Sequence, residues 1–210
     1  MSVGRRISRN TDEGDMRAIL NSPYFLWALL CVPAVPMTAG ALSGNPNAFH
    51  QLLHPTGEFA ARFMIIAMMA TPLMMALPGW RGPRWMVRNR RYFGVAAFAY
   101  ALAHTVFYLI DVGIAGALDQ ATKLSIWTGW LAFLVFVPLA VTSNNKAVRV
   151  MGPAWKRLQR WVYGAAILTL IHWAALHDWG GVGPAMVHFG PLAALSIWRA
   201  WATRTRRTAA

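Results

Sequence analysis

Six stretches of this sequence are rich in apolar residues and close to the length at which a helix crosses a lipid bilayer. They cover residues 22–42, 57–77, 92–114, 124–141, 158–177 and 182–201. A helix needs about 20 residues, at about 1.5 Å each, to cross roughly 30 Å of hydrocarbon. Prolines inside several stretches are tolerated in membrane helices, because neighbouring groups satisfy the freed backbone atoms. The pattern predicts an all-α integral membrane bundle of six transmembrane helices.

The basic residues alternate between the connections of these segments. Nearly all of them lie in the N-terminal tail, in the loops after the second and fourth segments, and at the C-terminal end, whereas the other three connections contain only Lys123. Since Lys and Arg are retained on the cytoplasmic side during insertion, both termini are expected in the cytoplasm. We expect a cytoplasmic tail over 1–21, a membrane domain over 22–201 and a basic C-terminal tail over 202–210.

The composition fits a membrane protein better than a nucleic-acid-binding one. Only 13% of the residues are charged, about half the fraction of a soluble domain. The formal net charge is +13, but it lies in short clusters between apolar segments, where it sets topology and attracts anionic lipid. We therefore expect a multi-pass protein of the bacterial inner membrane, with lipid and not nucleic acid as the partner of its basic residues.

The N-terminal segment has some features of a cleavable signal peptide. Basic residues precede it and small residues end it at Ala39, Gly40 and Ala41. However, Asp12 and Glu13 interrupt the basic region, and the apolar part is long enough to span the bilayer. An uncleaved first helix is expected.

Two histidines lie inside predicted membrane helices, where ionisable residues usually have a function. His104 follows Arg91 by thirteen residues, and His172 follows Arg160 by twelve. Both helices start at the cytoplasmic side, so at about 1.5 Å per residue the two imidazoles lie at one depth, roughly 18–20 Å from the inner boundary. Two imidazoles at one depth on neighbouring helices can ligate a haem iron from its two sides.

The face that carries His104 has small residues, including Gly94 and Ala101, which leave room for a porphyrin. Tyr108 lies one turn beyond His104, and Leu168 lies one turn before His172. All four are candidate cofactor contacts. The alternative stays open, because small residues also let membrane helices pack closely and histidines form interhelical hydrogen bonds.

Other polar residues are secondary candidates. Arg62 lies just below the outer surface and is placed to pair with a haem propionate, although a snorkelling arginine explains its position equally well. His188 lies near the depth of the pair and is a substitute ligand of lower rank. His50 and His54 are expected in an outer loop, without the further ligands that zinc requires.

Several short motifs support one resemblance: 54–57, 70–73, 90–94 followed by His104, 142–144, 155–158, 162–163 and 171–173. Together they resemble the ferric-reductase-like transmembrane domain family over about residues 45–200. The similarity is strongest to the haem-binding subunits of the periplasmic methionine sulfoxide reductase system.

The resemblance implies that His104 and His172 hold b-type haem. It further implies that electrons pass from a cytoplasmic flavin reductase or a quinol to a periplasmic molybdopterin enzyme. One position departs from the family, which has a histidine thirteen residues before its fifth-segment ligand where this chain has Gln159. Glutamine is a poor haem ligand, so a second, inner haem is in question. Either FMN or a quinone accepts electrons near the cytoplasmic side, or the partner differs.

The sequence thus predicts an electron-transfer subunit rather than an enzyme in its own right, because bis-histidine ligation leaves iron no open position. One alternative is a stand-alone membrane cytochrome that reduces ferric iron or oxygen. Such proteins usually carry a fused flavin and nicotinamide domain, for which this chain has no room. The other alternative is a small transporter or assembly factor without haem, in which the histidines are structural.

Overall fold

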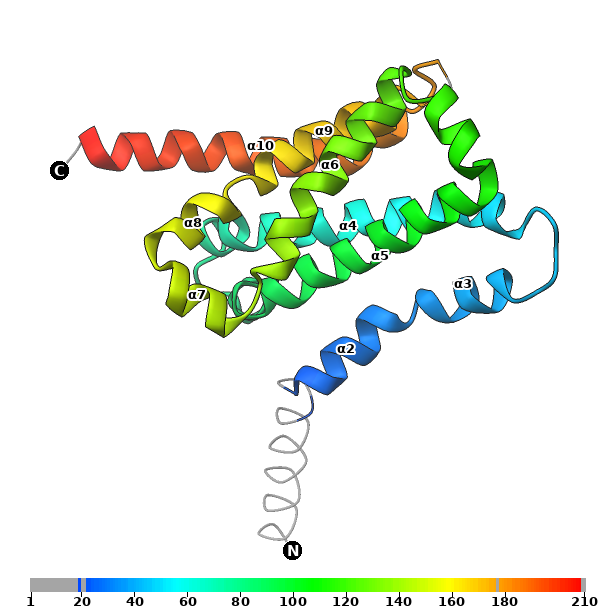
Figure 1. Cartoon of the computed structure of the whole chain (residues 1–210). Coiled ribbons are helices and arrows are strands. Elements are labelled where there is room, and N and C mark those ends of the chain that lie inside the picture. Colours follow the sequence, from blue (N-terminus) through cyan, green and yellow to red (C-terminus); the bar gives the residue numbers. More distant parts are fainter. Residues whose placement is uncertain (1–18, 20–21, 177, 209–210) are drawn as a thin grey trace, which may run out of the picture.

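The computed structural model describes Ile19 and residues 22–176 and 178–208, and the regular structure in this part of the chain is helical. This confirms the all-α prediction, whereas the predicted N-terminal tail lies outside the described residues apart from Ile19. Figure 1 shows the helices, which are α2 (Pro23–Cys31), α3 (Ala34–Ala41), α4 (Ala48–Ala76), α5 (Arg81–Asp119), α6 (Leu124–Val141), α7 (Asn145–Met151), α8 (Pro153–Gln159), α9 (Val162–Ala174) and α10 (Val182–Thr208).

Three helices, α4, α5 and α6, are long and apolar enough to cross a membrane. Helices α2 and α3 together form a fourth candidate span, bent by 46° at a short break. The break lies at Val32 and Pro33, and Pro36 lacks the amide hydrogen that would bond to the carbonyl of Val32. The chain is therefore a multi-pass membrane protein, and its described part contains three or four candidate spans.

The predicted count of six spans is not confirmed, because the last two segments differ from a simple span. Helix α9 has 13 residues, which cover about 20 Å of a hydrocarbon layer of roughly 30 Å. Helix α10 has 27 residues. Glycines, prolines and His188 lower the hydropathy of its first half, and its second half carries arginines. Since α10 continues to Thr208, the predicted tail from residue 202 begins as the end of that helix.

Helix α4 begins earlier than the sequence indicates. His50 and His54 lie on α4, so the expectation that they occupy an outer loop was wrong. The expectation relied on Pro55 as a sign of a loop. However, a proline inside a helix removes only one backbone hydrogen bond and bends the helix, and α4 continues through Pro55. Helix α5 also extends past its prediction, with non-helical backbone at Gly113.

Helix α4 is the centre of the bundle, since it packs against α3, α5, α9 and α10. Helix α6 packs mainly against α9, and α2 lies along α5. Phe59 and Phe63 of α4 contact Tyr100 of α5 with ring centroids 5.8 and 5.3 Å apart. The Tyr100 hydroxyl donates to the carbonyl of Leu30 at 3.0 Å, which ties α2 to this core.

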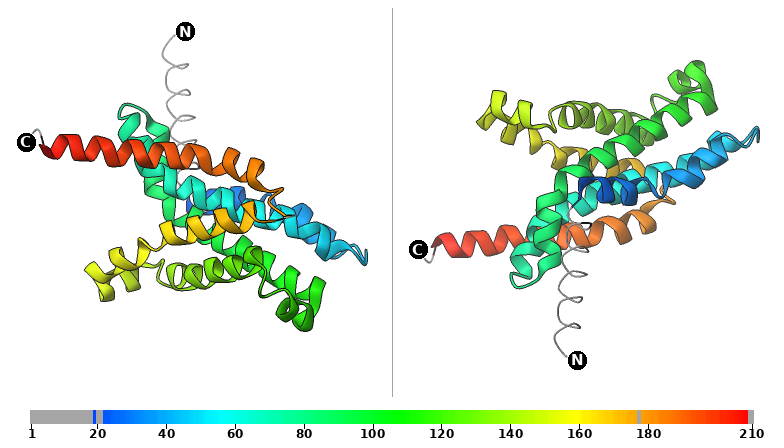
Figure 2. Two further views of the ribbon diagram at one scale, coloured as in Figure 1. Left: turned by 90° about the horizontal axis from the view of Figure 1, so that it is seen from above. Right: turned by 90° about the horizontal axis from the view of Figure 1, so that it is seen from below.

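The connections segregate to two ends of the bundle (Figures 1 and 2). The turn between α4 and α5, helices α7 and α8 and the C-terminal part of α10 lie at one end, and the other three connections lie at the opposite end. The first end, here called the basic end, carries the arginines and lysines of 81–91, 146–160 and 199–206. This arrangement matches the alternation of charge in the sequence.

The outer faces of the helices are apolar and exposed, as expected of surfaces that contact lipid. Large hydrophobic side chains on these faces include Leu102, Val106, Ile110, Leu131, Leu134, Ile167, Val187 and Ile197.

Candidate functional site

The structure brings together the two histidines that the sequence places at one depth. His104 projects from α5 and His172 from α9, and their ring centroids are 6.2 Å apart with the ring planes at 82°. Imidazole nitrogens bind transition metals at about 2 Å. Two rings bound to opposite sides of one metal therefore have centroids roughly 6 Å apart, so the observed spacing suits bis-imidazole ligation.

Both imidazoles use Nδ1 in the same way. The Nδ1 of His104 lies 2.9 Å from the carbonyl oxygen of Leu53 on α4, and the Nδ1 of His172 lies 2.5 Å from that of Ser125 on α6. A carbonyl only accepts hydrogen bonds, so in each ring Nδ1 carries the proton. The lone pair is then on Nε2, which is the tautomer that ligates a metal through Nε2.

A glycine lies against each ring on the helix that supplies the carbonyl. A Cβ added to Gly57 would lie 3.1 Å from both Nδ1 and Cε1 of His104, and one added to Gly129 would lie 2.7 Å from Nδ1 of His172. A larger residue at position 129 would collide with the imidazole of His172, and one at position 57 would press on that of His104. Each ring thus packs directly against the backbone of a glycine.

Two cavities meet at the histidine pair. A smaller one of about 100 Å³ extends between α4, α5 and α6, and a larger one of about 430 Å³ extends toward the end opposite the basic end. The walls of the smaller cavity are largely apolar and contain Ala60, Ala61, Ala101, Ala132, Phe133 and Phe136. The larger one ends among polar side chains, including His50, His54, Glu58, Asp111 and Gln120.

Tyr108 lines both cavities. Its hydroxyl is buried and has no hydrogen-bond partner among the described residues. A buried hydroxyl without a partner is costly, which indicates that a bound group completes its hydrogen bonding.

These features fit a haem. The described residues contain no group of three or more His, Cys, Asp or Glu that could hold a bare metal ion, whereas a porphyrin brings four nitrogen ligands of its own and needs only two from the protein. The two neighbouring imidazoles, whose Nε2 atoms carry the lone pairs, suit the iron. The small apolar walls suit the macrocycle, and the unpartnered Tyr108 hydroxyl suits a carboxylate.

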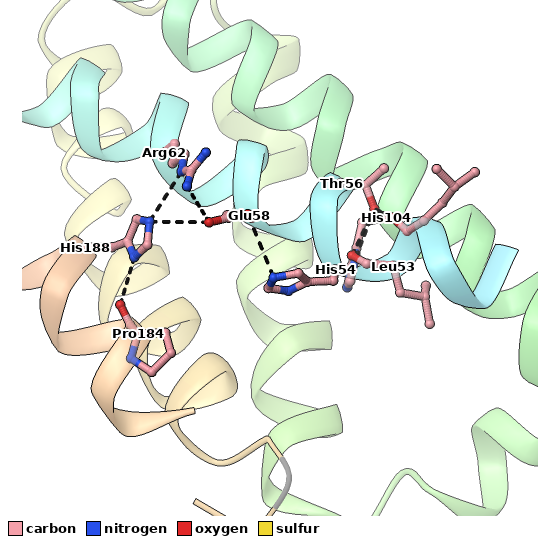
Figure 3. Close-up of polar contacts among 9 residues, drawn as sticks. Leu53, His54, Thr56, Glu58, Arg62, His104, Pro184 and His188 are labelled. Atoms are coloured by element: carbon pink, nitrogen blue, oxygen red, sulfur yellow. Dashed lines mark hydrogen bonds and ion pairs between the residues drawn. The ribbon is translucent and has the colours of Figure 1, made fainter. Parts of the chain in front are cut away.

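The other residues that the sequence suggested as cofactor contacts differ in whether they line the two cavities. Ala101 lines the smaller cavity, but neither Gly94 nor Leu168 is among the residues that line the two cavities. Arg62 is turned toward α10: its Nη2 donates to Glu58 Oε1 at 2.5 Å and its Nε to His188 Nε2 at 3.3 Å (Figure 3).

His188 is engaged by these contacts. Its Nδ1 donates to the carbonyl of Pro184 at 2.8 Å, its Nε2 accepts from Arg62, and its ring lies 4.8 Å from that of Trp173. Neither nitrogen is directed at the pair formed by His104 and His172.

Glu58 is the functional candidate that the sequence reasoning missed. Its side chain is 19% exposed, lines the larger cavity and contacts Arg62, His188 and His54. A signal was present, because an acidic residue four positions before an arginine in a membrane helix is rare and usually functional. Gly57 and Gly129 carried no comparable signal, since a glycine beside another helix is common.

Gln159 lies at the basic end, away from the pair. Its Nε2 donates to the carbonyl of Leu139 at 3.1 Å and to Oγ1 of Thr142 at 3.3 Å. Gln159 thus joins the end of α8 to the end of α6.

Comparison with known proteins agrees with this architecture. Residues 56–170 match the family described as ferric reductase like transmembrane component. The chain belongs to this family of membrane proteins, which confirms the resemblance drawn from the motifs.

Its curated relatives define the branch. The chain is 34% identical to a protein-methionine-sulfoxide reductase heme-binding subunit MsrQ of Brucella anthropi, over 84% of this chain and 80% of that protein. For the MsrQ proteins of Caulobacter vibrioides and Azospira oryzae the identities are 35% and 33%, over 81% and 83% of this chain and 80% and 76% of theirs. Within the family, the chain therefore groups with the MsrQ subunits. No solved structure matches it.

Proposed function

We propose that this chain binds one b-type haem between His104 and His172 and relays electrons across the bacterial inner membrane to a periplasmic methionine sulfoxide reductase. The observation that carries the proposal is the facing imidazole pair, with both Nδ1 atoms donating to carbonyls and both Nε2 atoms left as ligands. The MsrQ relatives are named heme-binding subunits of a protein-methionine-sulfoxide reductase, which supports haem binding and a reductase partner.

The chain's own residues would act mainly by fixing the position of the cofactor and excluding water from it. Haem held by His104 and His172 would supply a one-electron carrier. Gly57, Gly129 and the alanines of the smaller cavity let the helices enclose the macrocycle. Tyr108 would donate its free hydroxyl to a propionate, and Arg62 would neutralise the Glu58 carboxylate, which lines the larger cavity.

The direction of transfer follows from the proposed topology. The basic end would face the cytoplasm, where a flavin reductase, FMN or quinol would deliver electrons. The opposite end, with the polar mouth of the larger cavity, would then face the periplasm and a molybdenum-dependent reductase.

A reoxidation experiment tests the relay. The purified protein is reduced with dithionite, freed of reductant, and mixed with methionine sulfoxide, with the purified catalytic subunit of the reductase from the same organism, or with both. We expect the reduced b-type bands to decay only with both. Bands that persist in that mixture would refute the partner, and a protein that purifies without a Soret band would refute the cytochrome.

A further inference from the structure

Two threonines in different helices make the same pair of hydrogen bonds. The Thr56 hydroxyl on α4 lies 2.6 Å from the carbonyl of Leu52 and 3.1 Å from that of Leu53. The Thr128 hydroxyl on α6 lies 2.6 Å from the carbonyl of Leu124 and 3.1 Å from that of Ser125. Both side chains are 1% exposed. Threonines that bond back to these carbonyls bend a helix locally and fix the carbonyl direction.

The second carbonyl of each pair is also the one that holds a histidine. The carbonyl of Leu53 accepts from His104 Nδ1, and the carbonyl of Ser125 accepts from His172 Nδ1. Figure 3 shows His104 beside Leu53 and Thr56, whose Oγ1 lies 3.3 Å from the ring nitrogen. Thus one hydroxyl and one imidazole share each carbonyl oxygen.

The glycine that admits each ring follows its threonine directly. Carbonyl, hydroxyl and glycine come from residues 53, 56 and 57 on α4 and from residues 125, 128 and 129 on α6. The two sets have the same spacing, although α4 serves a histidine of α5 and α6 serves a histidine of α9. Two independent occurrences of one arrangement, each centred on one imidazole, are more than a packing coincidence.

We propose that Leu53, Thr56 and Gly57, and equally Ser125, Thr128 and Gly129, form two copies of one positioning device that sets the orientation and electron donation of each histidine. The proposal rests on the proposed function, because it assumes that the imidazoles ligate haem. The hydroxyl directs the carbonyl, the carbonyl keeps the proton on Nδ1, and the glycine lets the ring approach. A firm Nδ1 hydrogen bond makes Nε2 a stronger donor, which favours ferric over ferrous iron.

The test uses Thr56→Val and Thr128→Val, which remove the hydroxyl at nearly constant volume, and Thr56→Ser and Thr128→Ser, which retain it. Without the hydroxyl the carbonyl returns toward its own helix and the Nδ1 bond weakens. We expect each valine variant to raise the haem midpoint potential, up to about a tenfold change in the reduced-to-oxidised ratio, or about 59 mV for one electron. The low-spin electron paramagnetic resonance signal should also change, and the serine variants should restore both values.

Thr142→Val is the matched control. Thr142 is the residue after the last one of α6, and like Thr56 and Thr128 it bonds back to two carbonyls, those of Pro138 and Leu139, at 2.7 and 3.4 Å. However, Leu139 accepts from Gln159 and not from a histidine, so this variant should keep the wild-type potential.

The outcomes separate this inference from the proposed function. A wild-type protein without haem refutes the function itself. A haem-loaded wild type whose valine variants keep or lower the potential, or whose serine variants behave like the valine ones, refutes the positioning role and leaves the ligands standing. Gly57→Ala and Gly129→Ala add a second measurement: either should alter the resonance signal or reduce haem content, and a wild-type signal at full haem content would overturn the glycine part.

Discussion

The imidazole of His104 lies close to that of His172, with the ring planes at 82° and the centroids 6.2 Å apart. The pair connects α5 to α9, and both of these helices begin at the basic end. Each ring is held by a different neighbouring helix, so its plane is set independently of the other. The near-perpendicular arrangement follows from these two separate supports.

The angle between the rings predicts a spectroscopic signature. When two axial imidazoles lie in perpendicular planes, the iron d orbitals that they perturb stay close in energy, and the ferric low-spin resonance is highly anisotropic. We expect the oxidised protein to show this signal type in a frozen-solution electron paramagnetic resonance spectrum. A rhombic signal of the kind given by parallel imidazoles would contradict the ring geometry, even with both ligands correct.

The ion pair between Arg62 and Glu58 predicts opposite shifts of potential. Arg62→Gln leaves the Glu58 carboxylate beside the larger cavity without its partner, which stabilises ferric haem and lowers the potential. Glu58→Gln does the reverse. A unit charge at about 10 Å, with an effective dielectric constant of about 20, contributes on the order of 1–2 kcal/mol, which corresponds to tens of millivolts.

Redox titration of the purified variants measures these shifts. Arg84→Gln is the control. Arg84 lies at the basic end, and within the described part of the chain its side chain donates hydrogen bonds to the carbonyls of Gly79 and Trp80. Equal shifts in the same direction for Arg62→Gln and Glu58→Gln would rule out an electrostatic role for the pair.

The break in α5 predicts a loss of stability on substitution. Gly113 has φ 70° and ψ 169°, a backbone region that is essentially restricted to glycine. Gly113→Ala should lower the free energy of unfolding by roughly 1–3 kcal/mol, measured by equilibrium unfolding in mixed micelles. Gly82→Ala, in the same helix and with no atom within 4 Å of the added Cβ, should cause no loss. Equal stabilities for the two variants would show that the break carries no strain.

The sequence was sufficient for the features that depend on counting along a helix. Helix α6 has the predicted bounds, and the prediction that His104 and His172 lie at one depth is consistent with the 6.2 Å between their ring centroids. These properties are local, because the rise per residue of a helix hardly varies.

Features that depend on contacts between helices could not be predicted from the sequence. Gly57 and Gly129 lie far from their histidines in the sequence, and nothing local distinguishes them from glycines that only aid packing. The start of α4 was misplaced because Pro55 was read as a loop residue. The role of Arg62 also depended on tertiary structure, since its partners include His188 on α10.

The central claim is that His104 and His172 hold one haem, and haem content measured on purified variants tests it most directly. The wild type and His188→Ala should each contain one haem per chain with a reducible low-spin b-type spectrum, because the His188 nitrogens bond to Pro184 and Arg62. His104→Ala and His172→Ala should each lose that spectrum. Retention of the wild-type spectrum and haem-to-protein ratio in either of these two variants would contradict the account.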